Sequence, residues 1–101
     1  MSKARTVYEL VPDLKRLRDD VLYGDVWEQT NLTKRDRSLI TCAMLSALYR
    51  TDELKAHMKI ALDNGVTEDE LRGLITHVAF YGGWPCAMNA GRVGVEVFGD
   101  S

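Results

Sequence analysis

The stretch NGVTEDELRGLITHVAFYGGWPC, residues 64–86, contains the signals that decide the fold of this chain. Asn64 and Gly65 can end a helix, because glycine adopts the left-handed conformation that commonly follows a helix C-terminus. Thr67 and Glu70 have the spacing of a capping box, which predicts that a new helix begins there. The apolar face of that helix has helical spacing and consists of Leu71, Leu74, Ile75, Val78 and Ala79.

The same stretch also ends this helix and begins the next. Gly82 and Gly83 interrupt the periodic pattern, and Pro85 fits the first turn of a helix, where its missing N–H costs nothing. The last helix contains Gly91 and Gly94, although an interior glycine costs up to about 1 kcal/mol relative to alanine. We therefore expect another backbone to approach closely there, and the leftover apolar surface favours self-association.

Helical signals also precede residue 64. Thr33 can cap a long central helix, with Asp36 completing a pair that resembles a capping box, and Thr51 is predicted to cap the next helix. Pro12 can open a first helix that runs to about Tyr23, and a short helix is expected over about 25–29. The first helix is predicted to turn four apolar side chains inward: Leu14, Leu17, Val21 and Leu22.

Strand signals are nearly absent, so the fold class is predicted to be all-α. We expect about six helices in a compact bundle with short connections. A length of 101 residues is enough for one domain with one modest core, and we predict a single domain over residues 1–101.

The composition excludes several function classes. The formal net charge is -2 and no basic run occurs, which argues against nucleic acid as a partner. No apolar stretch approaches the roughly 20 residues that cross a bilayer, so we expect no membrane partner. The two cysteines, Cys42 and Cys86, have neither CxxC nor Cys/His metal spacing, so no metal site is predicted. Without a signal peptide, we expect reduced thiols and a cytoplasmic location.

The segment DELKAH, residues 52–57, carries the first candidate chemistry. Glu53 lies one helical turn before His57, and such a pair can fix one imidazole tautomer and raise its basicity for acid–base catalysis. An ordinary ion pair on a helix surface has the same spacing, and spacing alone favours that interpretation.

Four further residues are candidates for a binding pocket. Arg37, near the start of the central helix, could clamp a carboxylate with its planar guanidinium, or could simply be solvated. His77, with Tyr81 one turn later, could line a pocket, although a histidine on an apolar helix is more often a core residue. Trp84 follows two glycines, where it could plug a tight turn or flank a helix N-terminus that receives an anion.

Three segments in one order closely resemble the carboxymuconolactone decarboxylase family. They are ELKAH, ALDNGVTEDEL and HVAFYGGWPCAMNA, and the similarity runs from about Val26 to Phe98. The resemblance implies an all-α, AhpD-like fold that assembles as a homo-oligomer, a hexamer or a trimer.

The family resembled has a redox branch, the alkylhydroperoxidase D-like proteins, with a CxxC motif before the active-site histidine. Mapped onto His57, those thiols fall at Arg50 and Glu53, and a glutamate of that branch falls at Ser38. The resemblance therefore disfavours sulfur redox chemistry.

The decarboxylase branch converts 4-carboxymuconolactone to 3-oxoadipate enol-lactone and CO2 without a cofactor, in the β-ketoadipate pathway of aromatic degradation. This resemblance implies that the chain is a carboxy-lyase acting on a small carboxylate or lactone. His57 is then expected to donate a proton or stabilise an oxyanion, with Glu53 orienting it. From the chemistry we expect Arg37 to clamp a carboxylate and three residues to line the pocket: His77, Tyr81 and Trp84.

Three other functions remain open. One is a related cofactor-free lyase or isomerase acting on another small lactone or keto acid. The second is a thiol-dependent antioxidant, which would need Cys42 and Cys86 close together. The third is a non-enzymatic oligomeric binding module, which predicts an exposed His57. A catalytic role predicts instead that His57 lines a cavity with Glu53 and an arginine.

Overall fold

The computed structural model describes residues 6–99 of the chain. The chain divides into two compact units, residues 1–32 and 33–101, and each unit is described by itself. A single domain over residues 1–101 stays a prediction, and residues 1–5 and 100–101 lie outside the described range.

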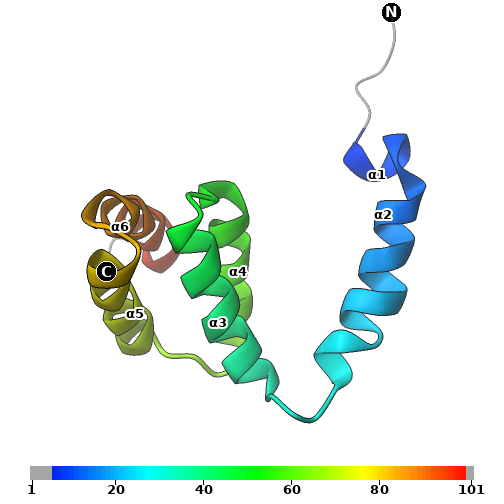
Figure 1. The fold of residues 1–101 in the computed structure, drawn as a ribbon, viewed down its shortest axis with the longest axis horizontal. Helices are drawn as coiled ribbons and strands as arrows, with labels where there is room; N and C mark the ends of the chain where they lie inside the picture. The colour runs from blue at the N-terminus through cyan, green and yellow to red at the C-terminus, as the bar shows by residue number, and fades with distance from the viewer. Residues whose placement is uncertain (1–5, 100–101) are drawn as a thin grey trace, which may run out of the picture. The chain divides into compact units, whose positions relative to one another are not determined.

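The first unit is a run of short helical segments (Figure 1). Helices α1 (Val7–Leu10) and α2 (Pro12–Arg16) are followed by the π-helix η1 (Leu17–Tyr23) and the 3-10 helix η2 (Val26–Glu28). The predicted extent of the first helix, from Pro12 to Tyr23, is confirmed, although its second half is wound as a π-helix. Helix α1 was not predicted.

The inward orientation predicted for Leu14, Leu17, Val21 and Leu22 is wrong, since all four side chains are exposed. A single helical run offers no second layer within its own unit against which an apolar stripe could pack. Within residues 6–32 the buried residue is Trp27, whose ring lies 5.7 Å from that of Tyr23 between centroids.

The second unit contains four longer helices: α3 (Lys34–Ala47), α4 (Thr51–Asp63), α5 (Glu68–Tyr81) and α6 (Trp84–Phe98). Helix α3 packs against the other three, and α6 packs against both α4 and α5 (Figure 1). Residues 6–99 contain six α-helices and no strand, which confirms the all-α prediction. None of the described helices is both long enough and apolar enough to cross a membrane.

The predicted helix faces form the core of the second unit. The stripe of α4 is buried at Leu54, Met58 and Ala61, and the stripe of α5 is buried at Leu71, Leu74 and Val78. These side chains pack with Cys42 from α3 and with three residues of α6: Cys86, Ala90 and Val93.

Most of the predicted helix boundaries are confirmed. The Thr33 side chain accepts a hydrogen bond from the Asp36 N–H, Thr67 and Glu70 form a complete capping box, and Gly65 has a φ of 98°. The prediction that Thr51 caps α4 is wrong, because Thr51 is already helical and Arg50 takes the N-cap position. The helix begins one residue earlier than expected, and Tyr49, just before the N-cap, has a φ of 65°.

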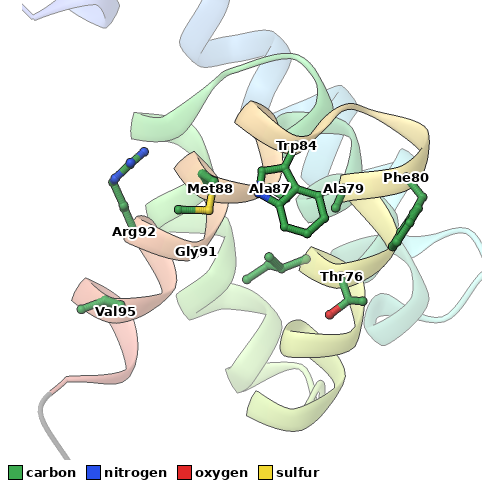
Figure 2. Close-up of a pocket in the computed structure, with 10 residues that line it drawn as sticks. Thr76, Ala79, Phe80, Trp84, Ala87, Met88, Gly91, Arg92 and Val95 are labelled. Atoms are coloured by element: carbon green, nitrogen blue, oxygen red, sulfur yellow. The ribbon is translucent and has the colours of Figure 1, made fainter.

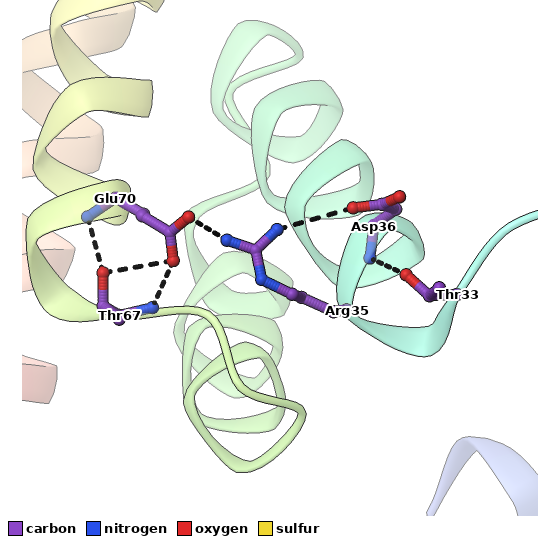
Figure 3. A network of polar contacts seen from close by, with 5 residues as sticks. All are labelled: Thr33, Arg35, Asp36, Thr67 and Glu70. Carbon is purple, nitrogen blue, oxygen red and sulfur yellow. Dashed lines mark hydrogen bonds and ion pairs between the residues drawn. The ribbon is translucent and has the colours of Figure 1, made fainter.

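A polar network joins α3 to the start of α5 (Figure 3). Arg35 forms ion pairs with Asp36 on its own helix and with Glu70, the carboxylate that also accepts from Thr67 N–H in the capping box. This network fixes the N-terminal end of α5 against the first turn of α3.

Candidate functional site

His57 lies beside the buried stripe of α4 and is itself half-buried. Its neighbours along the helix, Leu54 and Met58, are completely buried and hold this face of α4 against the core. The His57 Nδ1 atom is buried and has no hydrogen-bond partner within residues 6–99. Burial lowers the pKa of the imidazole, because desolvation disfavours the charged form.

Glu53 lies one turn before His57 on α4 and is exposed. Since Nδ1 of His57 has no hydrogen-bond partner, Glu53 does not bond that nitrogen in this structure. The orienting role of Glu53 therefore stays a prediction.

Arg37 lies in the first turns of α3 and is half-buried. Its backbone oxygen accepts a hydrogen bond of 2.7 Å from the Thr41 hydroxyl. The next residue, Ser38, is completely buried, and its hydroxyl accepts a bond of 2.9 Å from the Asn64 side-chain amide. Ser38 therefore ties α3 to the end of α4. It is the residue that the resemblance matches to a glutamate of the redox branch.

His77 and Tyr81 are brought together on α5. Their rings stack at 4.5 Å between centroids with an interplanar angle of 26°, and both side chains are exposed. His77 also lines a pocket of about 430 Å³ between α3 and α5, whose only other polar side chain is that of Glu70.

Trp84 begins α6 and lines a larger pocket of about 460 Å³ between α5 and α6 (Figure 2). Its ring meets that of Phe80 edge to face at 6.4 Å between centroids. Met88 and Val95 of α6 line the same pocket, and neither of them nor Phe80 was predicted as a site residue. For the two α6 residues the sequence signal was Gly91, an interior helix glycine that lies between them.

A third pocket, of about 390 Å³, adjoins this one at the other end of α6. His57, Glu53 and Arg37 line none of these three pockets. The single chain therefore brings His77 and Tyr81 together, and places Trp84 in a pocket, but does not join these residues to His57.

The two cysteines have different surroundings. Cys42 is completely buried, and burial raises the pKa of its thiol to about 11. Cys86 is also buried, and its Sγ lies 3.6 Å from the backbone oxygen of Ala47, to which it donates. Both thiols are free. Within residues 6–99, no three His, Cys, Asp or Glu side chains cluster as a metal ion would require.

Two kinds of comparison with known proteins point to the same group of enzymes, the decarboxylases. A sequence model described as the carboxymuconolactone decarboxylase family matches residues 12–96. A 4-carboxymuconolactone decarboxylase from Acinetobacter baylyi is 45% identical over 78 residues, covering 77% of this chain and 58% of that protein. A nitrosuccinic acid decarboxylase, npaB, from Metarhizium robertsii is 37% identical over 68 residues, covering 67% of this chain and 48% of that protein. The chain thus spans about half the length of the curated relatives it matches.

Proposed function

Since the chain belongs to the carboxymuconolactone decarboxylase family, we propose that it is a cofactor-independent carboxy-lyase. Its proposed substrate is 4-carboxymuconolactone, and its products are 3-oxoadipate enol-lactone and CO2, in the degradation of aromatic compounds. The proposal is supported by two relatives that are both named as decarboxylases.

The observation that carries the proposal is the half-buried His57, whose Nδ1 is shielded and has no partner within the described residues. A buried polar atom without a partner costs folding free energy, so such atoms concentrate where a ligand or a reaction uses them. The resemblance in the ELKAH segment also matches His57 to the family's active-site histidine.

The reaction breaks the bond between a ring carbon and its carboxylate. The electron pair moves through the adjacent C=C–C=O system to the lactone carbonyl oxygen, and a carbon of the ring is protonated afterwards. An enzyme must therefore hold the remaining carboxylate, stabilise the developing oxyanion and deliver one proton.

The lowered pKa of His57 suits this sequence of events. The imidazole of the free protein is uncharged at neutral pH and can donate an N–H hydrogen bond to the oxyanion. A bound carboxylate raises the pKa of a neighbouring imidazole, so substrate binding would favour the protonated form that acts as the acid.

The other site residues have subordinate roles in the proposal. Arg37 clamps a substrate carboxylate, for which its half-buried position and fixed charge are suited. Glu53 orients His57 once substrate is bound, and three residues complete the pocket: His77, Tyr81 and Trp84. We also propose that the enzyme works as a homo-oligomer in the cytoplasm.

The test is the release of CO2 from 4-carboxymuconolactone by the purified chain, without added metal or flavin. His57→Gln should lower kcat by at least about 100-fold, the usual contribution of a positioned acid or base. The matched variant His77→Gln removes the other histidine of the chain, and because His77 is proposed only to line the pocket, it should raise KM while lowering kcat far less than His57→Gln. An unaltered rate in a folded His57→Gln variant would disprove the catalytic role.

Nitrosuccinate is the natural competing substrate for this assay, because one relative is named for it. A nitro group can accept the electron pair of the broken bond much as the lactone carbonyl does. If nitrosuccinate has the higher kcat/KM, the chain is a carboxy-lyase for another small acid, and His57→Gln should abolish that activity instead.

A further inference from the structure

Asn64 and Gly65 form the turn that ends α4 and leads toward α5. Asn64 is the C-cap residue of α4, and Gly65 takes the left-handed conformation with a φ of 98°. A Cβ built on Gly65 would meet nothing within 4 Å, and the residue is exposed. Gly65 is therefore accessible to water, although it directly follows a helix that is packed in the core.

An asparagine followed by a glycine is the dipeptide that loses a side-chain amide most readily. The backbone nitrogen of the glycine attacks the side-chain carbonyl carbon of the asparagine, because glycine has no Cβ to obstruct the approach. A cyclic imide closes as the bond to the side-chain nitrogen breaks, and ammonia leaves with the proton of the glycine N–H. Water then opens the imide at either carbonyl carbon, which gives an aspartate or an isoaspartate. The reaction consumes water, releases ammonia and needs no oxidant or reductant.

Both reacting groups of this dipeptide are held by hydrogen bonds in the folded chain. The side-chain nitrogen of Asn64, which would leave as ammonia, donates to the Ser38 hydroxyl at 2.9 Å. The attacking group, the Gly65 N–H, donates to the backbone oxygen of Leu62 at 3.2 Å. Ser38 is completely buried, so water does not take its place as the partner of the amide. The reaction therefore requires the end of α4 to open first.

Loss of the Asn64 amide would weaken the attachment of α3 to α4, because either product lacks the N–H that bonds Ser38. An aspartate there adds a negative charge beside Asp63, at the C-terminus of α4, where the helix dipole is itself negative. An isoaspartate also lengthens the backbone by one methylene group shortly before Val66. Val66 is 2% exposed and belongs to the core, so the added length displaces a packed side chain.

We propose that Asn64 is a site of spontaneous deamidation, which the Ser38–Asn64 hydrogen bond holds unreactive in the folded chain. This bond joins residues 26 positions apart, so it forms only when α3 and α4 are packed together. Protection and stability are coupled: the packed helices protect the amide, and loss of the amide weakens their packing. The inference is independent of the proposed decarboxylase activity.

Mass spectrometry of the chain after incubation at mildly alkaline pH tests the site. Asn31 and Asn89 are internal controls, because Leu32 and Ala90 follow them instead of glycine. Conversion of Asn64 to aspartate and isoaspartate should be at least about 10-fold faster in urea than in the folded chain, which is the protection that one hydrogen bond supplies. The two controls should react slowly under both conditions. Equal rates at Asn64 in the folded and the unfolded chain would disprove protection by the fold.

Ser38→Ala isolates the contribution of the hydrogen bond. The variant keeps a small buried side chain but removes the acceptor of the Asn64 amide, and it should raise the deamidation rate of the folded chain about 10-fold. Gly83→Ala is the control, because it strains the start of α6 and lowers global stability without touching this pair. An unchanged rate in Ser38→Ala, or the same increase in both variants, would show that this bond does not protect Asn64.

Asn64→Asp reproduces one product and tests its effect on the fold. The variant should unfold at a lower urea concentration than the wild type, because it loses the bond to Ser38 and adds charge at a helix C-terminus. Asn31→Asp is the matched control, since it adds the same charge shortly before α3, where the helix dipole favours it. If Asn64→Asp unfolds at the same urea concentration as the wild type, the proposed coupling of deamidation to stability is wrong.

Discussion

Arg35 of α3 forms an ion pair with Glu70, and the same carboxylate closes the capping box of α5 with Thr67 (Figure 3). One side chain therefore both begins a helix and attaches it to a neighbouring helix. Glu70 also lines the pocket that contains His77, so this network sets the spacing of α3 and α5 along that pocket.

Replacing Glu70 should reveal how much its capping box and its ion pair together contribute to stability. Glu70→Ala removes the ion pair and half of the capping box, and we expect the free energy of unfolding to fall by about 1–2 kcal/mol. The ion pair supplies the smaller part, because the Arg35 and Glu70 side chains are 36% and 39% exposed and water screens their attraction. Urea denaturation followed by circular dichroism measures the change.

Two control variants separate these contributions. Glu70→Gln keeps a side-chain acceptor for the capping box and should cost less than about 1 kcal/mol. Glu68→Ala, which removes an exposed ion pair with Arg72 on the same helix, should change stability by at most about 0.5 kcal/mol. Equal losses for Glu70→Ala and Glu68→Ala would show that the network between helices has no energetic role.

The local signals of the sequence predicted the helices well. The capping box of Thr67 and Glu70, the glycine at residue 65 and the proline at residue 85 each act within a few residues, so their structure follows from their own neighbours. The Arg35–Glu70 pair joins residues 35 positions apart and depends on how α3 and α5 pack. No local pattern contains that information.

The candidate site was less predictable for the same reason. Spacing placed Glu53 one turn from His57, but the structure leaves Glu53 exposed and buries the His57 Nδ1 without a partner. The pocket beside Trp84 is lined by residues of both α5 and α6. Its position depends on tertiary packing, and in the sequence only Trp84 and Gly91 pointed to it.

His57 should make stability depend on pH. Its pKa is lower in the folded chain than the ordinary value of 6.5, so the unfolded chain binds the proton more tightly. The contribution of neutral His57 to the free energy of unfolding is fully present above about pH 6.5. It is lost as the pH falls through the pKa of the folded chain. Between pH 7 and pH 5, wild type should therefore lose more unfolding free energy than His57→Gln. Urea denaturation at each pH measures this difference. A slope for His57→Gln identical to that of the wild type would contradict the prediction.

Cys42 should resist modification in the folded chain. Its pKa is raised from 9.0 to about 11, so the reactive thiolate is about 100-fold scarcer than for an ordinary cysteine below pH 9. Maleimide labelling of a Cys86→Ala variant, read by mass spectrometry, isolates Cys42. Labelling of Cys42 in the folded chain in water should be at least about 100-fold slower than in the chain unfolded by urea. Rapid labelling of the folded variant, or thiol loss on treatment with peroxide, would favour the thiol-dependent alternative.

Tyr49 is a non-glycine residue with a φ of 65°, in the left-handed region that follows a helix C-terminus. Tyr49→Gly should raise the free energy of unfolding by up to about 1 kcal/mol, because glycine adopts this conformation without a Cβ clash. Thermal and urea unfolding measure the gain. Tyr49→Ala is the control, because it also removes the ring but keeps the Cβ, and it should give no such gain. A loss of stability with Tyr49→Gly would show that the exposed ring makes a compensating contact.

Gly73 and Gly83 should respond to alanine with opposite signs. Gly73 lies inside α5, and a Cβ built there meets nothing within 4 Å, so Gly73→Ala should stabilise the chain by up to about 1 kcal/mol through helix propensity. Gly83 is the N-cap of α6, with a φ of 105° that side chains rarely adopt, so Gly83→Ala should cost about 1–3 kcal/mol. Urea denaturation of both variants, with sedimentation at the same concentration, separates folding from association. A loss of stability with Gly73→Ala would show that the pocket of His77 is covered by another chain.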